Sequence, residues 1–297
     1  MTRVVEFLQA NPVQYLATVG CDGKAKCRPF MFCFEKDGKL WFCTNNTKDV
    51  YKDMQENPEI EVSVSNAEYA WIRLHGKAVF ENNKEIKEAC PGFAGVAVYA
   101  EVKNTVYCEG LWEEINAFTE ELTSTTRMED IKLQPAIAAT REAYKRCGKD
   151  PGRYRPSAEA LRRRLMRGIP LYQIDTLVDL INLVSLRTGY SIGGFDADKI
   201  KGATLELGIG KADEPFEGIG RGVLNIEGLP VYRDEIGGIG TPTSDNERTK
   251  MGLDTTHILA IVNGYSGADG LAEAADMIQE LLKKYAGCDS AQLFFFE

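Results

Sequence analysis

The sequence is poor in histidine and lacks long apolar runs. Only two histidines occur in its 297 residues, and none of the eight cysteines belongs to a Cys-x-x-Cys pair. Structural zinc sites use cysteine and histidine at short spacings, so we expect no zinc site of the usual kind. No run of about 18 consecutive apolar residues is present, so we also expect no membrane-spanning helix.

Nucleotide-binding fingerprints are missing as well. Gly218, Gly220 and Gly222 form a Gly-x-Gly-x-Gly run, which is not the dinucleotide-binding spacing, and no Walker motif occurs. The opening residues, MTRVVEFLQANP, predict an amphipathic helix rather than a signal peptide because their apolar run is short. The scattered cysteines fit reduced thiols. We therefore expect a cytoplasmic protein.

Length and charge limit the possible functions. The chain is long enough for two domains. A net charge of −9 argues against a protein that coats nucleic acid indiscriminately, although it permits a local basic patch. The pattern changes near Cys90-Pro91-Gly92. We expect two domains, 1–89 and 90–297, and an α+β fold class in which a small antiparallel barrel precedes a larger α+β domain.

Residues 1–89 contain several short strand patterns joined by tight turns. Asp22-Gly23 and Asp37-Gly38 suit hairpin turns. We expect strands at 15–20, 26–35, 40–44, 60–65 and 71–80, with helices at 3–9, 47–57 and 83–89. Thr47 is the expected cap of the second helix. This pattern indicates a small antiparallel barrel.

Residues 90–297 alternate irregularly between helices and strands. We expect strands at 93–102, 203–208, 223–226, 257–262 and 291–296, and helices from 111, at 135–147 and at 271–285. A short basic helix, capped by Ser157, leads to a second helix at 175–187. The second is apolar around most of its circumference, which predicts that it is buried. The irregular alternation favours an α+β domain.

The small barrel carries a candidate anion site. Arg28 shares a predicted strand with Phe30, Thr44 ends the next strand, and Lys48 begins the following helix. A hydroxyl, a helix N-terminus and two cations suit a phosphate group. The alternative is a solvated barrel edge with ordinary surface cations.

A later strand of the barrel adds an aromatic ring and a further cation. Trp71 and Arg73 alternate with Ile72 and Leu74, so Trp71 and Arg73 project from the same face. An indole and a guanidinium suit a planar, anionic ligand.

Three segments resemble the pyridoxamine 5′-phosphate oxidase-like, FMN-binding split-barrel family over residues 1–89: ATVGCDGKAKCRPFMF, WFCTNNTKDVYKDMQENPEIEV and WIRLHGKAVF. The resemblance implies a split β-barrel and a homodimer with FMN at the subunit interface. It implies that Arg28, Thr44 and Lys48 lie on the phosphate side, that Phe30 lies near the ring, and that Trp71 and Arg73 follow on the later strand. The last barrel strand of the family is expected to be absent here or replaced by 93–102 or 292–296.

A basic segment follows the middle of the chain. Residues 141–167 hold ten Lys or Arg against three acids, with Tyr144 and Tyr154 interleaved. Such a patch suits phosphate backbones. The candidate RNA-binding residues are Arg153, Arg155, Arg162, Arg163, Arg164 and Arg167. The last four belong to the basic helix, and we expect their side chains to stay on its outside. The alternative is a solvated helix face whose arginines pair with acids elsewhere.

The longest segment of this half, RPSAEALRRRLMRGIPLYQIDTLVDLINLVSLRTGYSIGGFDADKIKG, resembles the B3/B4 module of the phenylalanyl-tRNA synthetase β subunit. DEPFEGIG and GGIGTPTSD extend the likeness over residues 91–297. In the synthetase this module hydrolyses wrongly charged tyrosyl-tRNA. The resemblance implies that Asn182 is a polar residue of an editing pocket and that Gly237 and Gly238 form its glycine wall.

Two departures from the synthetase pattern concern the expected pocket. Gly193-Gly194 stand where the synthetase has a histidine before Phe-Asp, and the apolar strand at 257–262 stands where it has a pocket glutamate. No synthetase catalytic core is present. The resemblance therefore implies a free-standing relative of the module.

The residues themselves support a polar site beside a glycine-rich loop at 235–252. Asp179 and Asn182 are three residues apart on the buried helix and share one face. Buried polar groups must be hydrogen-bonded, either to the loop or to a ligand. The alternative is a polar pair that braces the loop. Backbone amides of 237–240 could stabilise an oxyanion.

Three functions follow from these observations. The first is a protein that binds tRNA or aminoacyl-tRNA, with possible hydrolysis of mischarged tRNA. The second is a flavin-dependent oxidoreductase that acts on a small amino-acid-like substrate. The third is a ligand-binding module without chemistry.

Overall fold

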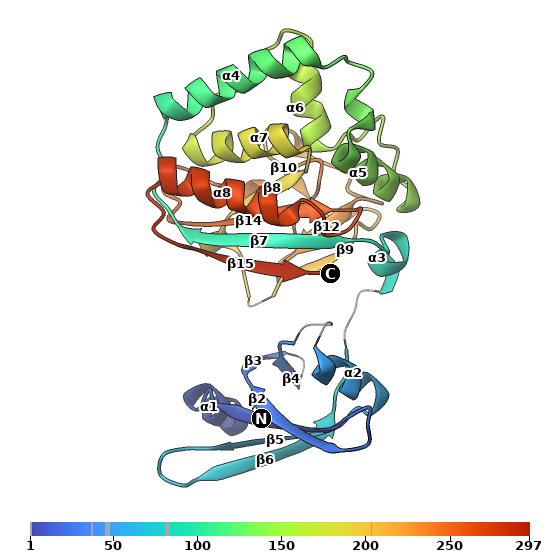
Figure 1. Cartoon of the computed structure of the whole chain (residues 1–297), viewed down its shortest axis with the longest axis vertical. Coiled ribbons are helices and arrows are strands. Elements are labelled where there is room, and N and C mark those ends of the chain that lie inside the picture. Colours follow the sequence, from blue (N-terminus) through green and yellow to red (C-terminus); the bar gives the residue numbers. More distant parts are fainter. Residues whose placement is uncertain (1, 37, 45–47, 81–83, 203) are drawn as a thin grey trace. The chain divides into compact units, whose positions relative to one another are not determined.

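The computed structural model describes residues 2–36, 38–44, 48–80, 84–202 and 204–297. The chain divides into two compact units, Met1–Asn82 and Asn83–Glu297, and both contain helices and antiparallel sheets (Figure 1). The α+β fold class is thereby confirmed. Within the described part of the chain, no helix combines the length and the apolar content needed to cross a bilayer.

The smaller unit is built on a four-stranded antiparallel sheet in the order β2-β1-β5-β6, beside a β3-β4 hairpin. Its elements are α1 (Thr2–Ala10), β1 (Gln14–Val19), β2 (Ala25–Phe30), β3 (Phe32–Lys36), β4 (Lys39–Phe42), α2 (Asp49–Glu56), β5 (Glu59–Ser65) and β6 (Trp71–Lys77). The single strand predicted at 26–35 is wrong, because the chain leaves β2 at Met31 before β3 begins. The expected cap Thr47 lies outside the described residues, and Lys48 is the N-cap of α2.

One face of this sheet packs on α2 and the other is open. Register places Leu16 of β1 opposite Val62 of β5, and Val62 opposite Leu74 of β6. Val50 and Met54 of α2 pack against this row. Because side chains alternate along a strand, the neighbouring positions face away from this core. This alternation fixes which predicted site residues can meet.

Neither strand considered as a replacement for the last barrel strand pairs with the smaller unit's sheet. β7 (Ala94–Glu101) and β15 (Ala291–Phe296) pair with each other along residues 95–100 and 291–296. They belong to a sheet of the larger unit with the order β15-β7-β14-β8, which includes β14 (His257–Gly264) and β8 (Ile192–Asp196). Among the described residues, the barrel therefore keeps two separate sheets.

The larger unit has three layers (Figure 1). Helices cover one face of the β15-β7-β14-β8 sheet, and a small sheet in the order β13-β12-β9 lies on the other. The helices are α3 (Lys84–Ala89), α4 (Glu109–Thr125), α5 (Pro135–Arg146), α6 (Ser157–Leu165), α7 (Thr176–Thr188) and α8 (Leu271–Tyr285). The small sheet comprises β9 (Glu206–Ile209), β12 (Pro230–Arg233) and β13 (Gly238–Gly240). The strand predicted at 223–226 is wrong: only Gly222–Val223 (β11) pairs, with Glu217–Gly218 (β10).

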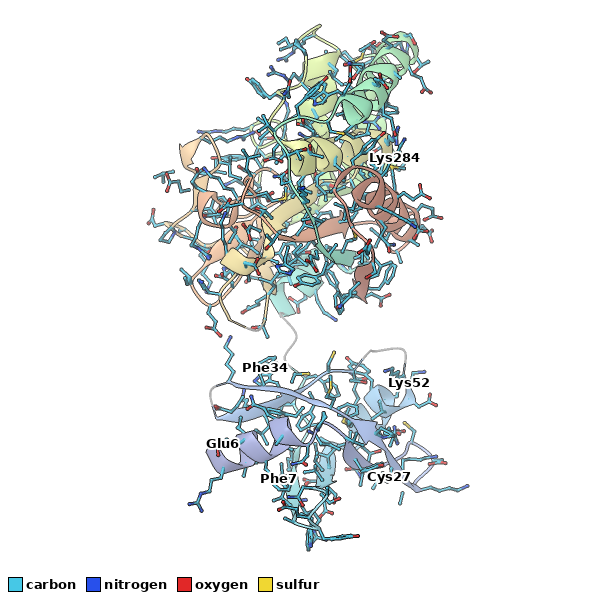
Figure 2. All side chains as sticks on the ribbon, turned by 90° about the vertical axis from the view of Figure 1, so that its left-hand side faces the viewer. Glu6, Phe7, Cys27, Phe34, Lys52 and Lys284 are labelled. Carbon is cyan, nitrogen blue, oxygen red and sulfur yellow. The ribbon has the colours of Figure 1, made fainter. Side chains whose placement is uncertain are left out.

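Ion pairs tie the helices of the larger unit together on its surface. Lys284 of α8, labelled in Figure 2, lies 2.8 Å from Glu114 of α4, and Arg187 of α7 binds the other oxygen of the same carboxylate. Tyr285 also donates to Glu114. These charge-assisted hydrogen bonds lower the pKa of Glu114 to about 2 although partial burial raises it.

The central helix α7 follows from local sequence signals. The side chain of Asp175 accepts a hydrogen bond from the Val178 amide and caps the first turn. Gly189 ends the helix with a φ of 81°, a backbone conformation that other residues rarely adopt. The predicted burial of this helix is confirmed, since Leu177, Leu180 and Leu183 have no exposed surface. The predicted Ser157 cap of α6 is wrong, because Pro156 is its N-cap and supplies no side-chain hydrogen bond.

Candidate functional sites

A hollow of about 400 Å³ in the smaller unit brings together three of the predicted cofactor residues. Arg28, Phe30 and Lys48 all line it. Its other walls are largely apolar: Pro12, Val13, Pro29, Met31, Cys43 and Val50. β2 supplies Arg28 and Phe30, and the N-terminus of α2 supplies Lys48. The hollow thus combines apolar walls with a cationic end.

Two buried polar groups of the smaller unit lack partners among the described residues. The Thr44 hydroxyl and the Trp41 indole nitrogen are buried and make no hydrogen bond with the described residues. Buried polar atoms are rarely left in this state. Thr44 follows Cys43, which lines the hollow, but Thr44 itself is not among the lining residues.

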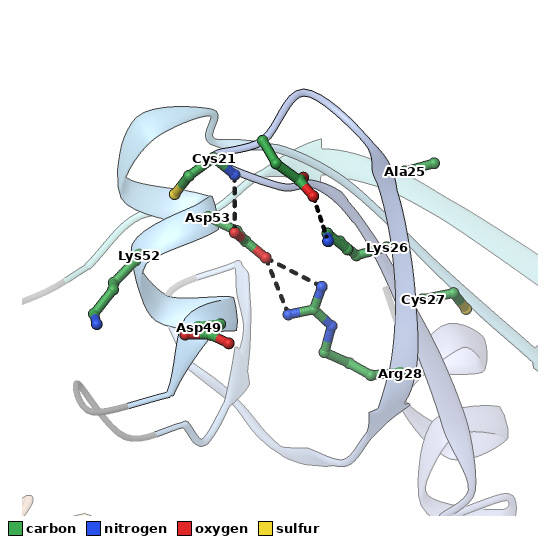
Figure 3. Close-up of a pocket in the computed structure, with 9 residues that line it drawn as sticks. Cys21, Ala25, Lys26, Cys27, Arg28, Asp49, Lys52 and Asp53 are labelled. Carbon is green, nitrogen blue, oxygen red and sulfur yellow. Dashed lines mark hydrogen bonds and ion pairs between the residues drawn. The ribbon is translucent and has the colours of Figure 1, made fainter.

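Arg28 is partly committed within the protein. Its guanidinium lies 3.2 Å from Asp53 (Figure 3). It also donates to the Thr18 hydroxyl at 3.0 Å. Asp53 also accepts from the Cys21 amide at 3.0 Å. Arg28 borders a second hollow of about 670 Å³, which Lys52 and Asp53 also line. Its charge is shared with a fixed carboxylate, so Lys48 is the less committed cation of the smaller hollow.

Trp71 and Arg73 do not join this group within one chain. Arg28 lies opposite Leu16 on the inner face of the sheet. Arg73 lies opposite Ser63, whose other neighbour is the exposed Tyr15, so Arg73 is on the outer face. β2 and β6 form opposite edges of the sheet, about 14 Å apart at about 4.8 Å per strand step. Trp71 is 65% exposed on that outer face.

In the larger unit, the predicted polar pair on α7 does not bind the glycine-rich loop. Asp179 is buried and accepts hydrogen bonds from the Trp112 indole at 2.8 Å and from the Ile174 amide at 3.1 Å. Burial raises its pKa to about 6. Asn182 is half-buried rather than buried. Asp179 therefore braces α4 and the chain entering α7.

The predicted glycine wall is held by an ion pair. Arg248 binds both carboxylate oxygens of Asp234 at 2.8 and 2.9 Å, and Asp234 accepts from the Gly237 amide at 3.1 Å. These hydrogen bonds lower the pKa of Asp234 to about 2 although burial raises it. Gly237 has a φ of 155°, and a Cβ on Gly238 would lie 2.9 Å from the Phe216 ring. Gly237 is therefore required by its backbone conformation and Gly238 by the adjacent Phe216 ring, and Arg248 is not free to bind a ligand.

Asp245 is a candidate that the sequence reasoning did not single out. Its Oδ2 accepts from the Gly194 amide at 3.1 Å, and no donor to Oδ1 occurs among the described residues. Cβ atoms on Gly193 and Gly240 would lie 3.5 and 2.8 Å from Oδ1. Burial raises the pKa of Asp245 to about 7, and the Gly194 amide opposes this shift. The sequence offered one signal: Asp245 is an acid in the loop at 235–252. The glycines that surround it, Gly193 and Gly240, lie on two separate strands.

The basic helix α6 is less open than predicted. The expectation that Arg162 stays outside is wrong: it is 8% exposed and donates to the Leu186 carbonyl at 2.5 Å, at the end of α7. Arg163 lies 2.7 Å from the buried Glu159. Arg164 donates to the Pro170 carbonyl and lies 3.8 Å above the Tyr172 ring. Arg162 thus reaches α7, Arg163 pairs within α6, and Arg164 binds the segment that follows α6.

The remaining basic residues stay at the surface. Arg153, Arg155 and Arg167 are exposed. Together with the partly covered Arg164 they form the part of the predicted patch that a phosphate backbone can reach.

Comparisons with known proteins agree with the two-unit fold. Residues 1–103 match the pyridoxamine 5′-phosphate oxidase family, and residues 139–287 match the B3/4 domain family. No curated protein matches the chain.

Three solved structures are similar to parts of the chain. A NimC/NimA family protein from Clostridium acetobutylicum has 31% identity over 43% of this chain and 71% of its own, with a TM-score of 0.25. A protein from the same organism related to general stress protein 26 of B. subtilis, of the pyridoxine-phosphate oxidase family, has 18% identity over 29% of this chain and 63% of its own, with a TM-score of 0.25.

The third is an N-terminal fragment of the phenylalanyl-tRNA synthetase β subunit from Pyrococcus horikoshii. It has 14% identity over 89% of this chain and 66% of its own, with a TM-score of 0.37. Because the match at 139–287 spans half of the sequence, this protein belongs to the B3/4 domain family and carries a pyridoxamine 5′-phosphate oxidase-like region at residues 1–103.

Proposed function

We propose that the smaller unit binds FMN in the 400 Å³ hollow. The observation that carries this proposal is the meeting of Arg28, Phe30 and Lys48 around one hollow with apolar walls. Thr44 follows the lining residue Cys43, and its hydroxyl has no partner among the described residues, which makes it the nearest predicted residue that a phosphate could engage after a small side-chain movement. The match to the pyridoxamine 5′-phosphate oxidase family supports it independently.

Each residue has a physical role in this proposal. Lys48 and the first amides of α2 attract the phosphate, since a helix N-terminus carries partial positive charge. Phe30, Met31 and Val50 exclude water from the flavin ring. FMN, when bound, supplies hydride or single-electron transfer. The protein would then act as a flavin-dependent oxidoreductase.

We further propose that the protein is a homodimer in which Trp71 and Arg73 of one copy complete the site of the other. Within one chain these residues lie on the opposite face and edge of the sheet from Arg28. The outer face also exposes Tyr15 and Val19. Exposed apolar surface of this kind favours association.

Titration of the purified protein with FMN, followed by flavin fluorescence and absorbance, tests the site. Lys48→Ala should weaken binding about tenfold or more, whereas Lys52→Ala should change it little. Lys52 is the matched control because it lies one turn along α2 and lines the other hollow. Equal loss in both variants, or no FMN binding by the wild type, would rule out this site.

The mass of the protein in solution tests the proposed homodimer, and the response of bound flavin to reduced nicotinamide tests the proposed oxidoreductase activity. Light scattering should give the mass of two chains, and Trp71→Ala should weaken FMN binding without unfolding the protein. Bleaching of bound flavin by NADH or NADPH would support oxidoreductase activity. A monomer that binds FMN fully would disprove the shared site.

A second function is favoured by Asp245. We infer that the larger unit binds an amino-acid-like ligand, either free or as the aminoacyl end of tRNA. Asp245 would accept a hydrogen bond from a polar group of this ligand. The space beside Asp245 Oδ1 is open because Gly193 and Gly240 have no side chains. This oxygen also lacks a protein donor among the described residues. Membership in the B3/4 domain family supports a tRNA-related ligand. The exposed Arg153, Arg155 and Arg167 would contact the RNA backbone.

Release of tyrosine from mischarged tyrosyl-tRNA tests this inference. Activity that is lost in both Asn182→Ala and Asp245→Asn would support editing hydrolysis, with backbone amides of 237–240 stabilising the oxyanion. Binding of tyrosyl-tRNA without release would support a binding module. If neither occurs while FMN binding persists, the larger unit does not act on aminoacyl-tRNA.

A further inference from the structure

Two cysteines meet where two helices of the larger unit end. Cys90 follows α3, and its amide donates to the Ile86 carbonyl at 2.7 Å. Cys147 is the C-cap of α5, and its amide donates to Ala143 at 2.9 Å. Both side chains pack in one apolar cluster, and each thiol shifts the pKa of the other. They lie 57 residues apart in sequence, so only the fold brings them together.

Arg146 places a positive charge beside this pair. Its Nε donates to the Ala89 carbonyl at 2.7 Å, which fixes the guanidinium next to Cys90. The hydrogen bond from the Cys147 thiol, and then the charge of Arg146, lower the pKa of Cys90 although burial raises it. The partner thiol of Cys147 has its pKa raised by the same hydrogen bond. The pair therefore favours one thiolate beside one protonated thiol, and Arg146 places its positive charge on the Cys90 side.

Cys288 shows what burial does without such neighbours. It is 5% exposed, and burial raises the pKa of its thiol. Cys90 is 2% exposed, yet its pKa moves the other way. The difference is due to the groups that contact Cys90 rather than to its depth.

A third polar group lies in the same cluster without a partner. Tyr265 is 5% exposed, and its hydroxyl makes no hydrogen bond with the described residues. It packs in the same apolar cluster as Cys90 and Cys147. A buried donor of this kind can stabilise an oxygen added to one of these sulfurs.

We propose that Cys90 and Cys147 form a redox-active dithiol that a small hydroperoxide oxidises to a disulfide. The Cys90 thiolate attacks one peroxide oxygen, the O–O bond breaks, and the leaving hydroxide takes up a proton to become water. The Cys147 sulfur then attacks the Cys90 sulfenic acid, the S–O bond breaks, and the proton of Cys147 leaves with the oxygen as a second water. Two thiols lose two electrons, and hydrogen peroxide is reduced to two waters.

The disulfide would link the end of α3 to the end of α5. It would close a loop of 57 residues and restrict the unfolded chain, so it would stabilise the larger unit. This proposal does not depend on flavin or tRNA binding.

The experiment treats the intact wild-type protein with hydrogen peroxide, blocks free thiols, and maps linked peptides by mass spectrometry after digestion without reductant. The expected product joins the Cys90 and Cys147 peptides with the loss of two hydrogen atoms. In Cys147→Ser, Cys90 should stop at a sulfenic acid that dimedone traps. Cys288→Ser is the matched control and should leave the link unchanged.

Arg146 tests the charge effect through the pH dependence of the reaction. Arg146→Met should raise the pH at which Cys90 reacts half-maximally and slow its oxidation at pH 7 by about three- to tenfold, whereas Arg146→Lys should restore most of the rate. Circular dichroism checks that each variant is folded. The proposal is overturned if the wild type forms no Cys90–Cys147 link while exposed cysteines such as Cys33 and Cys43 are oxidised, or if Arg146→Met leaves the pH profile unchanged.

Discussion

Both terminal guanidinium nitrogens of Arg28 lie 3.2 Å from the same carboxylate oxygen of Asp53. The other oxygen of Asp53 accepts from the Cys21 amide. This ion pair stands where the two hollows of the smaller unit meet, since Arg28 lines both. A residue predicted to hold a phosphate is thus already neutralised by the protein, and its affinity for an anion depends on Asp53.

Replacement of Asp53 by Asn should free Arg28 for an anion. We expect inorganic phosphate and FMN to bind roughly three- to tenfold more tightly, because a fixed negative charge is removed from beside the cation. The unit should also unfold at a lower temperature, since a charge-assisted pair is lost. Titration calorimetry and thermal unfolding measure the two effects. Asp49→Asn is the control, and weaker phosphate binding by Asp53→Asn would contradict the assignment.

The half-buried carboxyl of Asp245 makes stability depend on pH. Its pKa is about 7 when folded, against 3.8 in its ordinary state, so between these values the folded protein binds the proton more tightly. The free energy of unfolding should therefore fall as pH rises from about 4 to about 7. One pKa unit corresponds to about 1.4 kcal/mol, so the ionised carboxylate costs on the order of 2–4 kcal/mol above pH 7.

Asp245→Asn tests this effect directly. It should unfold at higher denaturant than the wild type at pH 8 and show little advantage at pH 4. Asp179→Asn provides a comparison. The pKa of Asp179 is about 6, so its ionisation should lower the free energy of unfolding by less, and this decrease should be complete at a lower pH. Denaturation curves at several pH values measure both. A wild type and an Asp245→Asn variant with parallel pH dependence would disprove the raised pKa.

The arginines of the basic segment should separate into structural and surface residues. Arg162→Met should lower the free energy of unfolding by about 2 kcal/mol, because the Leu186 carbonyl loses its buried donor. Arg155→Met should change it by less than about 0.5 kcal/mol. If the segment binds RNA, Arg155→Met should weaken binding and reduce the salt slope by about 1. Filter binding at several salt concentrations measures this, and equal stability loss in both variants would contradict the structure.

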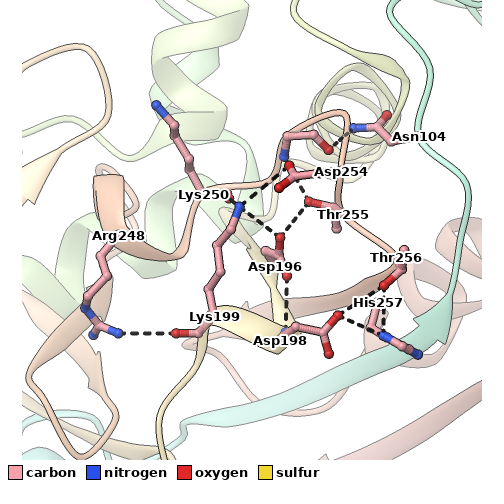
Figure 4. Close-up of polar contacts among 11 residues, drawn as sticks. Asn104, Asp196, Asp198, Lys199, Arg248, Lys250, Asp254, Thr255, Thr256 and His257 are labelled. Atoms are coloured by element: carbon pink, nitrogen blue, oxygen red, sulfur yellow. Dashed lines mark hydrogen bonds and ion pairs between the residues drawn. The ribbon is translucent and has the colours of Figure 1, made fainter.

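His257 and Asp198 form a surface pair whose contribution has a pH window. His257 Nδ1 lies 2.9 Å from Asp198 Oδ2 (Figure 4). The hydrogen bond to Asp198 raises the pKa of His257, and the same bond lowers the pKa of Asp198. The histidine contribution is complete below about pH 6.5 and is lost as pH rises through the folded pKa of His257. The aspartate contribution is present above about pH 3.9 and is lost as pH falls through the folded pKa of Asp198.

NMR titration of the imidazole protons tests this pair, with His75→Gln used to assign the signals. The pKa of His257 should lie above 6.5 in the wild type and return toward 6.5 in Asp198→Asn. The thermal stability lost in Asp198→Asn should be greatest between about pH 4 and pH 6.5 and should shrink at pH 9. An unchanged His257 titration in Asp198→Asn would show that the pair does not form in solution.

Several elements could be predicted from local sequence. The bounds of α8 and β15 agree with the predicted 271–285 and 291–296. α7 was predictable because Asp175 caps its first turn and Gly189 ends it. These features depend on residues within one helix turn or on strand alternation, which operate at short range along the chain.

Other features needed the three-dimensional arrangement. Met31 separates β2 from β3, although the one residue of 26–35 that typically interrupts strands, Pro29, lies inside β2. β7 pairs with β15 from the far end of the chain rather than with the barrel. Strand pairing is set by contacts between distant segments, and a single sequence does not record them.

The sequence by itself determined the two-part composition, the lack of zinc ligands at short spacing, and the residues Arg28, Phe30 and Lys48 of the candidate flavin site. Tertiary structure alone decided that Arg162 is buried, that Asp245 finds no second donor among the described residues, and that Cys90 and Cys147 pack in one cluster. The physical reason is that burial and charge pairing depend on which distant segments pack together. Residue type and spacing fix what each side chain can do, whereas packing fixes what it touches.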